Sequence, residues 1–398
     1  ESMIDHDDSS SGSHMAVEAV PPPEPKPAAE AKPEVRTDDD YLMVFLQPIR
    51  KFLEDPTLSE IMVNRFDEIW IERKGKIIRT DARFGSDMAL RAAIENVANA
   101  VGRRIDEMSP QLDARLPDGS RVHAVLPPCA RKGCCLDIRK FSREKLTIDK
   151  LIEFGSMTPD MAKFLDGTVK IAKNLMVSGG TGSGKTSLLN VVSSLIPEHD
   201  RILVIEDAAE LQLQQEHILP FETRTADKKG KGLVSIRHLI HSALRLRPDR
   251  IVIGEIRGGE ALDLLQAMNT GHGGSMSTIH ANSPADTLSR LETCCLMAGV
   301  DLPHRAIRDQ IASAIEVVVY TARLNDGSRK TMSIAEIAGQ HEDGKYKVNE
   351  IFKFEREGIS KEGKVIGRHR ATGNLPTYYE QFQHAGIDMP RSMFERGK

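Results

Sequence analysis

A glycine-rich loop between an apolar strand and a helical run limits the fold of this chain more than any other feature. The loop begins at Gly179, continues for four residues, and then reads Gly184, Lys185 and Thr186. This spacing is the phosphate-loop motif, in which backbone N–H groups at the start of a helix surround phosphate oxygens. We expect Lys185 to neutralise the β and γ phosphates of a nucleotide and Thr186 to hold Mg²⁺. The residues expected to bind the nucleotide are Gly179, Gly180, Thr181, Gly182, Ser183, Gly184, Lys185, Thr186 and Ser187.

Apolar segments alternate with helical runs on both sides of this loop. Such alternation indicates βαβ units and a mostly parallel, twisted sheet. We therefore predict an α/β fold, with a RecA-like nucleotide-binding domain and its C-terminal extension over residues 169–398. The expected strands are residues 171–178, 201–205, 250–254, 275–279, 316–320 and 346–354, and a last helix is expected near residues 377–385.

The chain before this domain falls into four parts. Residues 41–148 mix short apolar strands with amphipathic helical runs, which predicts a smaller α+β N-terminal domain, and residues 149–168 are expected to link it to the larger domain. Residues 15–40 are rich in proline, alanine and charge with little to bury, so we expect a disordered arm. Residues 1–14 are expected to be an expression-tag remnant, because the string SSGSHM over residues 10–15 is typical of one.

The composition argues against several classes of protein. The 54 Lys and Arg residues are balanced by 58 Asp and Glu residues, and aromatic residues make up 5%, so no nucleic-acid partner is expected. The five cysteines include two adjacent pairs and no CxxC spacing, which argues against zinc. No apolar stretch reaches the roughly 18 residues that a membrane helix needs, so the chain is expected to be soluble.

Carboxylates follow two of the expected strands. The first strand ends in Glu206 and Asp207, with Glu210 three residues beyond, and the second ends in Glu255. Because loops at the ends of neighbouring parallel strands meet, these carboxylates are expected to face the phosphates. Helix capping or a solvated loop is the alternative for the first group, and an ordinary surface position is the alternative for Glu255. The residues expected to hold the metal are Thr186, Glu206 and Asp207.

Two histidines stand on either side of the strand expected over residues 275–279. His272 precedes the strand and His280 follows it, so the two are expected to bracket the nucleotide face of the sheet. Taken alone, a histidine is more often structural than functional. The functional reading therefore depends on the other motifs.

Four segments together resemble the type II and type IV secretion ATPase family, the hexameric motors of secretion systems and type IV pili. They are the phosphate loop, residues 205–211 (IEDAAEL), residues 247–258 (RPDRIVIGEIRG) and residues 271–284 (GHGGSMSTIHANSP). Within the family, residues 59–64, 101–107, 113–128 and 266–274 are most similar to the CpaF (TadA) branch of tight-adherence pilus ATPases. The absence of a tetracysteine motif also favours this branch over the type II secretion ATPases.

The resemblance implies roles for individual residues. It implies that Glu255 activates water. It places Glu206 and Glu210 in the family's aspartate box and His272 and His280 in its histidine box. Family members also supply arginines from the N-terminal domain. The candidates are Arg121, Arg139 and Arg143, with a surface charge as the alternative for each.

The function implied is that of a cytoplasmic ATP-hydrolysing motor. The resemblance implies ATP and Mg²⁺ as cofactors, a hexameric ring of identical subunits, and inner-membrane platform proteins as partners, so that the chain works at the inner face of the cytoplasmic membrane. Its task is expected to be assembly of a tight-adherence pilus or a related secretion apparatus, and retraction is left open. Two other readings share the phosphate loop: a nucleotide-gated regulatory module without turnover, and a DNA-handling motor.

Overall fold

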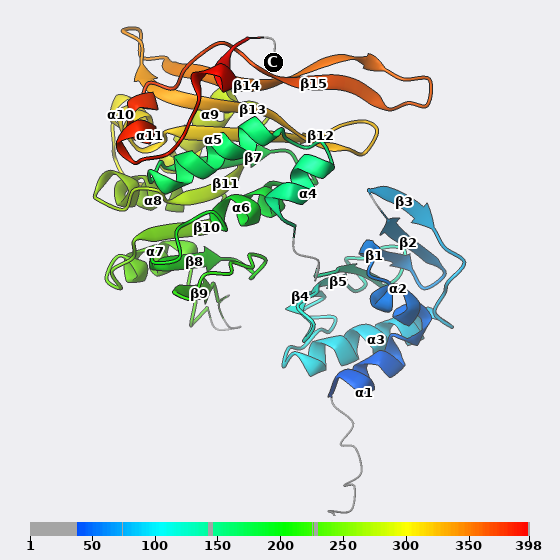
Figure 1. The fold of residues 1–398 in the computed structure, drawn as a ribbon. Helices are drawn as coiled ribbons and strands as arrows, with labels where there is room; N and C mark the ends of the chain where they lie inside the picture. The colour runs from blue at the N-terminus through cyan, green and yellow to red at the C-terminus, as the bar shows by residue number, and fades with distance from the viewer. Residues whose placement is uncertain (1–37, 74, 142–145, 225, 227–229, 397–398) are drawn as a thin grey trace, which may run out of the picture.

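The computed structural model describes residues 38–73, 75–141, 146–224, 226 and 230–396 (Figure 1). The expected tag remnant, nearly all of the expected arm and the candidate Arg143 lie outside these ranges. The described chain forms a small domain with one sheet and a larger domain with a second sheet. This is the expected mixed α/β fold, with the smaller α+β domain at the N-terminus. Among the described residues, no helix combines the length and apolar character needed to cross a membrane.

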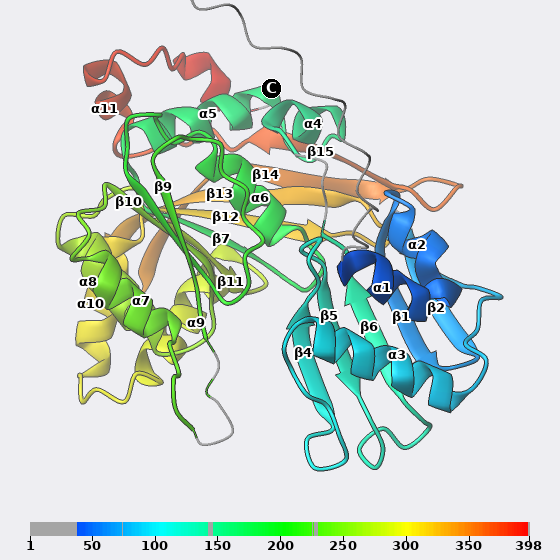
Figure 2. The same ribbon diagram turned by 90° about the horizontal axis from the view of Figure 1, so that it is seen from below.

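The N-terminal domain is built on an antiparallel sheet of six strands in the order β3-β2-β1-β6-β5-β4. Helices α1 (Asp38–Phe45) and α3 (Asp87–Ala100) lie on one face of it (Figure 2). A hydrophobic core lies between the sheet and these helices. Alternate residues of one strand, such as Ile61 and Val63, point into this core and are buried. The other elements are η1 (Gln47–Ile49), α2 (Arg50–Glu54), β1 (Leu58–Arg65), β2 (Glu68–Arg73), β3 (Lys76–Arg79), β4 (Gln111–Arg115), β5 (Arg121–Val125) and β6 (Cys135–Arg139).

The larger sheet has two halves of different kind. Six strands pair in parallel in the order β12-β7-β11-β10-β8-β9, and β13, β14 and β15 extend the β12 edge in antiparallel fashion. The parallel strands are β7 (Leu175–Gly179), β8 (Ile202–Glu206), β9 (Ile218–Glu222), β10 (Arg250–Ile256), β11 (Met276–His280) and β12 (Val317–Arg323). The antiparallel strands are β13 (Arg329–Gln340), β14 (Tyr346–Ile359) and β15 (Val365–Ala371).

Helices cover both faces of this sheet, so its strands are buried on both sides. In β7, Leu175 and Val177 enter one core while Met176 enters the other, as the period of two in a strand requires. The first face is covered by α4 (Ile148–Glu153), α5 (Pro159–Lys170), α6 (Lys185–Ser193), α11 (Tyr379–His384) and η2 (Arg391–Phe394), and the second by α7 (Ile236–Ala243), α8 (Glu260–Asn269), α9 (Pro284–Leu296) and α10 (His304–Ala314).

Residues 149–168, expected as a linker, are mostly helical and belong to the core of the larger domain. The Thr158 side chain caps α5, and Pro159 occupies its first turn, a combination that starts a helix firmly. Phe164 of α5 is fully buried and packs edge to face on Phe382 of α11. The segment has this structure because its apolar residues recur at helical spacing and cover the sheet.

Candidate functional site

The phosphate loop, residues 179–187, joins the carboxyl end of β7 to the start of α6. Gly182 and Gly184 have φ values of 70° and 91°, which only glycine adopts without strain. At Gly179, an added Cβ would lie 2.3 Å from the backbone oxygen of Thr321, so no larger residue fits. Gly184 caps α6 without any side-chain hydrogen bond. The first N–H groups of α6 are therefore left for a ligand.

Lys185 is the buried cation of the loop, with only 7% of its surface exposed. Its Nζ donates to the backbone oxygen of Gly180 at 3.1 Å and lies 3.3 Å from Nε2 of His280. Burial lowers the pKa of Lys185, and the charge of Glu255 opposes that shift. A buried ammonium group with one hydrogen bond to a neutral carbonyl and an adjacent cavity is placed to receive an anion.

Glu255, near the end of β10, is bound on both carboxylate oxygens. Its Oε1 lies 2.9 Å from Nε2 of His280, and its Oε2 accepts a hydrogen bond of 2.6 Å from Nε of Arg257. Burial, followed by the Lys185 charge, lowers the pKa of His280. The parallel register that sets His280 beside Gly179 brings these groups together. A carboxylate and a neutral imidazole next to a lysine can orient and deprotonate a water molecule.

Glu206, at the end of β8, is buried, and its Oε1 accepts hydrogen bonds from the backbone N–H groups of Glu210 and Leu211 at 2.9 and 3.0 Å. Burial raises the pKa of Glu206 to about 7. An added Cβ at Gly254 would lie 3.1 Å from Cγ of Glu206, so a larger residue there would press on the Glu206 side chain. Glu206 therefore shapes the loop after β8 more than it presents free charge.

Asp207, by contrast, is exposed. Its Oδ2 lies 3.4 Å from NH1 of Arg257, and its Oδ1 accepts a hydrogen bond of 3.3 Å from the hydroxyl group of Thr223.

The N-terminal domain supplies a second group of side chains to the same space. Arg121 of β5 and Arg139 of β6 are register partners, so both project from one face of the small sheet. Arg121 pairs with Oε1 of Glu210 at 2.6 Å, and Arg115 donates to the backbone oxygen of Ala209. The Arg139 guanidinium makes no hydrogen bond or ion pair with the described residues. Of the three arginines among the described lining residues, Arg121 and Arg257 are paired with carboxylates, whereas the N–H groups of the Arg139 guanidinium are free.

The two domains enclose a cavity of about 170 Å³. One side, which we call the loop wall, consists of the lining residues of the larger domain, which stand at or just beyond the ends of β7, β8, β10 and β11. The other side, the arginine wall, consists of Arg121 and Arg139. The described residues that line the cavity are Arg121, Arg139, Thr181, Gly182, Gly184, Lys185, Thr186, Ser187, Glu206, Asp207, Ala208, Glu210, Gly254, Glu255, Arg257 and His280.

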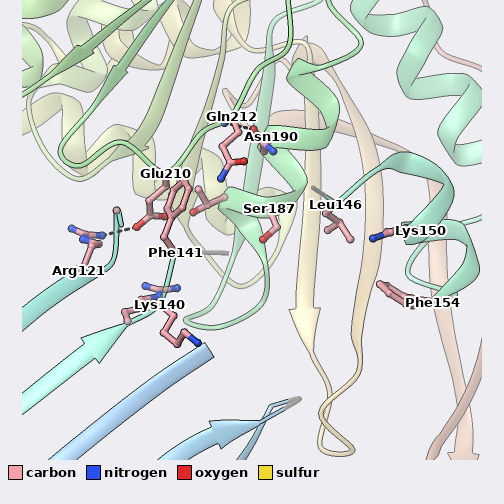
Figure 3. A pocket seen from close by; sticks show the side chains of 13 residues that line it. Arg121, Lys140, Phe141, Leu146, Lys150, Phe154, Ser187, Asn190, Glu210 and Gln212 are labelled. Carbon is pink, nitrogen blue, oxygen red and sulfur yellow. Dashed lines mark hydrogen bonds and ion pairs between the residues drawn. The ribbon is translucent and has the colours of Figure 1, made fainter. Parts of the chain in front are cut away.

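A second cavity of about 330 Å³ continues from the first, since both include Arg121, Arg139, Thr186, Ser187 and Glu210. Figure 3 shows this cavity from close by. On one side Arg121 points at Glu210, and on the other side lies α4 with Lys150. The remaining lining is partly apolar, with the side chains of Phe141, Leu146 and Phe154.

The structure brings most of the expected site residues together, with two exceptions. His280 lines the first cavity, whereas His272 precedes the amino end of β11 and places Nδ1 3.2 Å from the backbone oxygen of Ala267. His280 is the last residue of β11, whose five residues span roughly 13 Å, so the two histidines stand at opposite ends of that strand. The other exception is Arg143, which lies outside the described residues.

Sequence reasoning missed two arginines that contact the site. Arg257 binds Glu255, and its position two residues after Glu255, directly beyond the end of β10, is a signal that could have found it. Arg329, at the start of β13, donates from Nε to the backbone oxygen of Gly182 at 2.9 Å. No local sequence pattern indicates a role for Arg329, since it is 147 residues away from Gly182 in the sequence.

Comparison with known proteins gives consistent relatives. Residues 44–370 match the family model described as type II/IV secretion system protein. A putative conjugal transfer protein of Mycobacterium tuberculosis is 36% identical over 283 residues, which is 70% of this chain and 80% of the relative. The type IV secretion system protein VirB11 of Bartonella quintana is 31% identical over 348 residues, or 77% and 91% of the two chains. The solved ATPase DotB of Legionella pneumophila aligns with a TM-score of 0.54 at 20% identity, covering 76% of this chain and 82% of DotB.

Proposed function

The chain belongs to the type II/IV secretion system protein family, and on that premise we propose that it hydrolyses ATP with Mg²⁺ to drive a secretion or pilus machine. One observation carries the proposal: Lys185, Glu255 and His280 of the larger domain line one cavity with Arg121 and Arg139 of the smaller domain. A site assembled from two domains can gate its chemistry by their closure.

The two connected cavities fit a nucleoside triphosphate. The loop wall offers the uncapped N-terminus of α6 and the Lys185 ammonium group to phosphate oxygens. The larger cavity, about 330 Å³, lies within the usual range of roughly 300 to 1,000 Å³ for a ligand pocket. Its apolar side chains suit a nucleobase, so we place the phosphates in the smaller cavity and the nucleoside in the larger one.

Thr186 fits a role in holding Mg²⁺, because its side chain borders both cavities beside Lys185. The two carboxylates expected to share this task fit less well. Glu206 is buried with one oxygen bound to backbone N–H groups, and Asp207 already contacts Arg257 and Thr223. The described residues also contain no group of three or more His, Cys, Asp or Glu side chains arranged around a metal. Bound Mg²⁺ would offset phosphate charge during hydrolysis.

The side chains define a chemistry of in-line attack by water on the γ-phosphate. Glu255 orients the water and accepts its proton, with His280 holding the other oxygen of the carboxylate. Lys185 stabilises the negative charge of the phosphates. Arg139, whose donors are free, completes the charge stabilisation when the domains close. An arginine supplied late can change phosphoryl transfer by roughly 10³ to 10⁵-fold, so closure would control the rate.

We further propose that the chain works as a closed ring of six identical subunits, of the CpaF (TadA) branch, on an inner-membrane platform protein. The support is the resemblance of residues 59–64 and 113–128 to that branch together with the family membership. Rotation of the small domain against the large one would perform work on the platform at the inner face of the membrane. Pilus assembly is the task we favour, with conjugal transfer or secretion as related tasks, since relatives carry those names.

The test is phosphate release per subunit with Mg²⁺ and ATP, measured across protein concentration for the parent chain, Glu255→Gln and Glu54→Gln. Glu54 is an exposed residue of α2 and serves as the matched control. We expect the parent and the control to turn over ATP with activity that rises with concentration, and Glu255→Gln to bind ATP without turnover. A Glu255→Gln variant that hydrolyses at the parent rate would remove Glu255 from the mechanism.

A further inference from the structure

Arg257 makes more contacts with the catalytic carboxylate than any other described side chain. Its Nε and NH2 both reach Oε2 of Glu255, at 2.6 and 2.5 Å, while Oε1 of the same carboxylate faces His280. The remaining nitrogen, NH1, points to Oδ2 of Asp207 on the loop after β8, at 3.4 Å. The guanidinium thus connects the ends of two neighbouring strands of the parallel sheet.

The backbone around Arg257 is also held firmly. Its N–H group and that of Gly258 donate to the same oxygen, Oε1 of Glu260, at 2.7 and 2.8 Å. The turn from β10 into α8 is therefore closed by a side chain in the first turn of the helix. Because the turn is fixed, the Arg257 side chain has a defined starting point from which to reach Glu255.

A glutamate needs such support if it is to orient water. Its side chain has three rotatable bonds, and a displacement of about 1 Å in a catalytic group can cost roughly 10²-fold in rate. His280 alone fixes one oxygen, but a single contact leaves the carboxylate free to rotate about that contact. Arg257 supplies the second point, so that the plane of the carboxylate is defined with respect to Lys185 and the cavity.

We infer that Arg257 is a positioning residue, whose guanidinium holds the Glu255 carboxylate in its working orientation with Asp207 as a second anchor. The inference rests on the proposed function, because it assigns the support for the carboxylate that activates water. Arg257 lies on the loop wall itself and is distinct from Arg121 and Arg139, which come from the N-terminal domain.

A purely structural role for Arg257 is a poor fit to its surroundings. Its side chain is 60% exposed, and exposed ion pairs contribute only about 0 to 1 kcal/mol to folding stability. Substitution of Arg257 is therefore expected to leave the fold and the phosphate loop intact. That expectation allows the turnover of a variant to be read as a change at Glu255.

The experiment compares kcat, KM and the dissociation constant for ATP of the parent chain, Arg257→Gln, Arg257→Lys and Asp207→Asn. Arg104→Gln is the control, since Arg104 is a more exposed arginine, 76% open to solvent, that pairs with Asp106 in the N-terminal domain. We expect Arg257→Gln to lower kcat by roughly 10 to 100-fold with KM and affinity changed less than about threefold, the pattern of lost transition-state support. Arg257→Lys should recover part of the loss, and Asp207→Asn should lose less than Arg257→Gln does.

Each outcome decides the inference. If the parent turns over ATP and Arg257→Gln has the same kcat, the inference is overturned and the proposed function stands. A variant that loses ATP affinity as much as kcat would overturn it too, because Arg257 would then be binding nucleotide. A parent without turnover at any concentration would overturn the proposed function and this inference together.

Discussion

The two walls of the cavity are built in different ways. The loop wall consists of groups at the ends of adjacent parallel strands, where β7 and β11 are in register from Leu175 and Met276 to Gly179 and His280. The arginine wall stands on the sheet of another domain, and between the described residues it is joined to the larger domain by side-chain contacts such as the Arg121–Glu210 ion pair. A rigid sheet can hold a nucleotide at constant geometry, while a docked domain can change distance. The difference suggests that the phosphate loop governs binding, and that turnover depends on the arginine wall together with Glu255.

The largest effect on ATP binding should come from breaking the loop wall at Lys185. Lys185→Ala removes the buried ammonium group, and hydrogen bonds to charged groups contribute about 1.5 to 3 kcal/mol each, so affinity for ATP should fall roughly 10 to 100-fold or more. Isothermal titration with a non-hydrolysable ATP analogue measures the loss. Lys170→Ala, which removes an exposed lysine paired with Asp166, should bind like the parent. Retained affinity in Lys185→Ala would show that the loop wall does not carry binding.

The arginine wall should show the opposite pattern. Arg139→Ala is expected to reduce kcat by roughly 10³-fold, at the low end for an arginine that stabilises phosphoryl transfer, while affinity for the ATP analogue changes little. Steady-state phosphate release and the same titration separate the two quantities. If Arg139→Ala weakened ATP binding and left kcat unchanged, the assignment of the arginine wall to turnover would be wrong.

The buried carboxyl of Glu206 offers a test that does not depend on nucleotide. Its pKa is raised by burial to about 7 from an ordinary value of 4.5, so the folded chain holds this proton more tightly than the unfolded chain does. The resulting stabilisation is present below about pH 4.5 and is lost as the pH rises through 7, by roughly 3 kcal/mol.

Glu206→Gln should lack this pH dependence, and at pH 8 it should be at least as stable as the parent, because an amide oxygen can still accept from Glu210 and Leu211. Chemical denaturation at pH 5 and pH 8 provides the comparison, with Glu54→Gln as the exposed control. If the unfolding free energy changed equally between pH 5 and pH 8 in Glu206→Gln and in the parent, Glu206 would be ionised without cost and free to bind metal.

The smallest effect should come from the contact between the walls. The Arg121–Glu210 pair is partly exposed, and such pairs contribute only about 0.2 to 1 kcal/mol. Arg121→Gln should therefore alter stability little and turnover less than Arg139→Ala does. A double-mutant cycle with Glu210→Gln measures the coupling by denaturation and by phosphate release. A loss in Arg121→Gln equal to that in Arg139→Ala would make Arg121 the arginine that serves the phosphates.

The same contrast explains what could be predicted from the sequence. Glu255 and His280 stand at the ends of apolar strands, and Lys185 lies in the loop after β7. Because parallel strands end at one edge of a sheet, local pattern was enough to gather these three residues. Arg121 and Arg139 could not be ranked, because their distance from the phosphate loop depends on how two domains dock. His272 and His280 look symmetrical in the sequence, yet they lie at opposite ends of β11.

Long-range pairing accounts for most of what the sequence did not reveal in the fold. Strands β9, β13 and β15 carry mixed or exposed residues, so their apolar signal is weak, and their places are set by neighbours distant in the chain. The helices of residues 149–168 were also missed as parts of the core. Their apolar residues complete a face of the sheet that is visible only once the strands are assembled.

The most direct test of two walls within one chain is a mixing experiment. In this structure Lys185 and Arg139 of the same subunit line the same cavity. Lys185→Ala and Arg139→Ala subunits, each inactive alone, are mixed at a concentration where the parent is active, and phosphate release is measured. We expect no recovery, since no single chain then carries both groups. Activity restored in the mixture would show that Arg139 serves the site of a neighbouring subunit, and it would contradict the site described here.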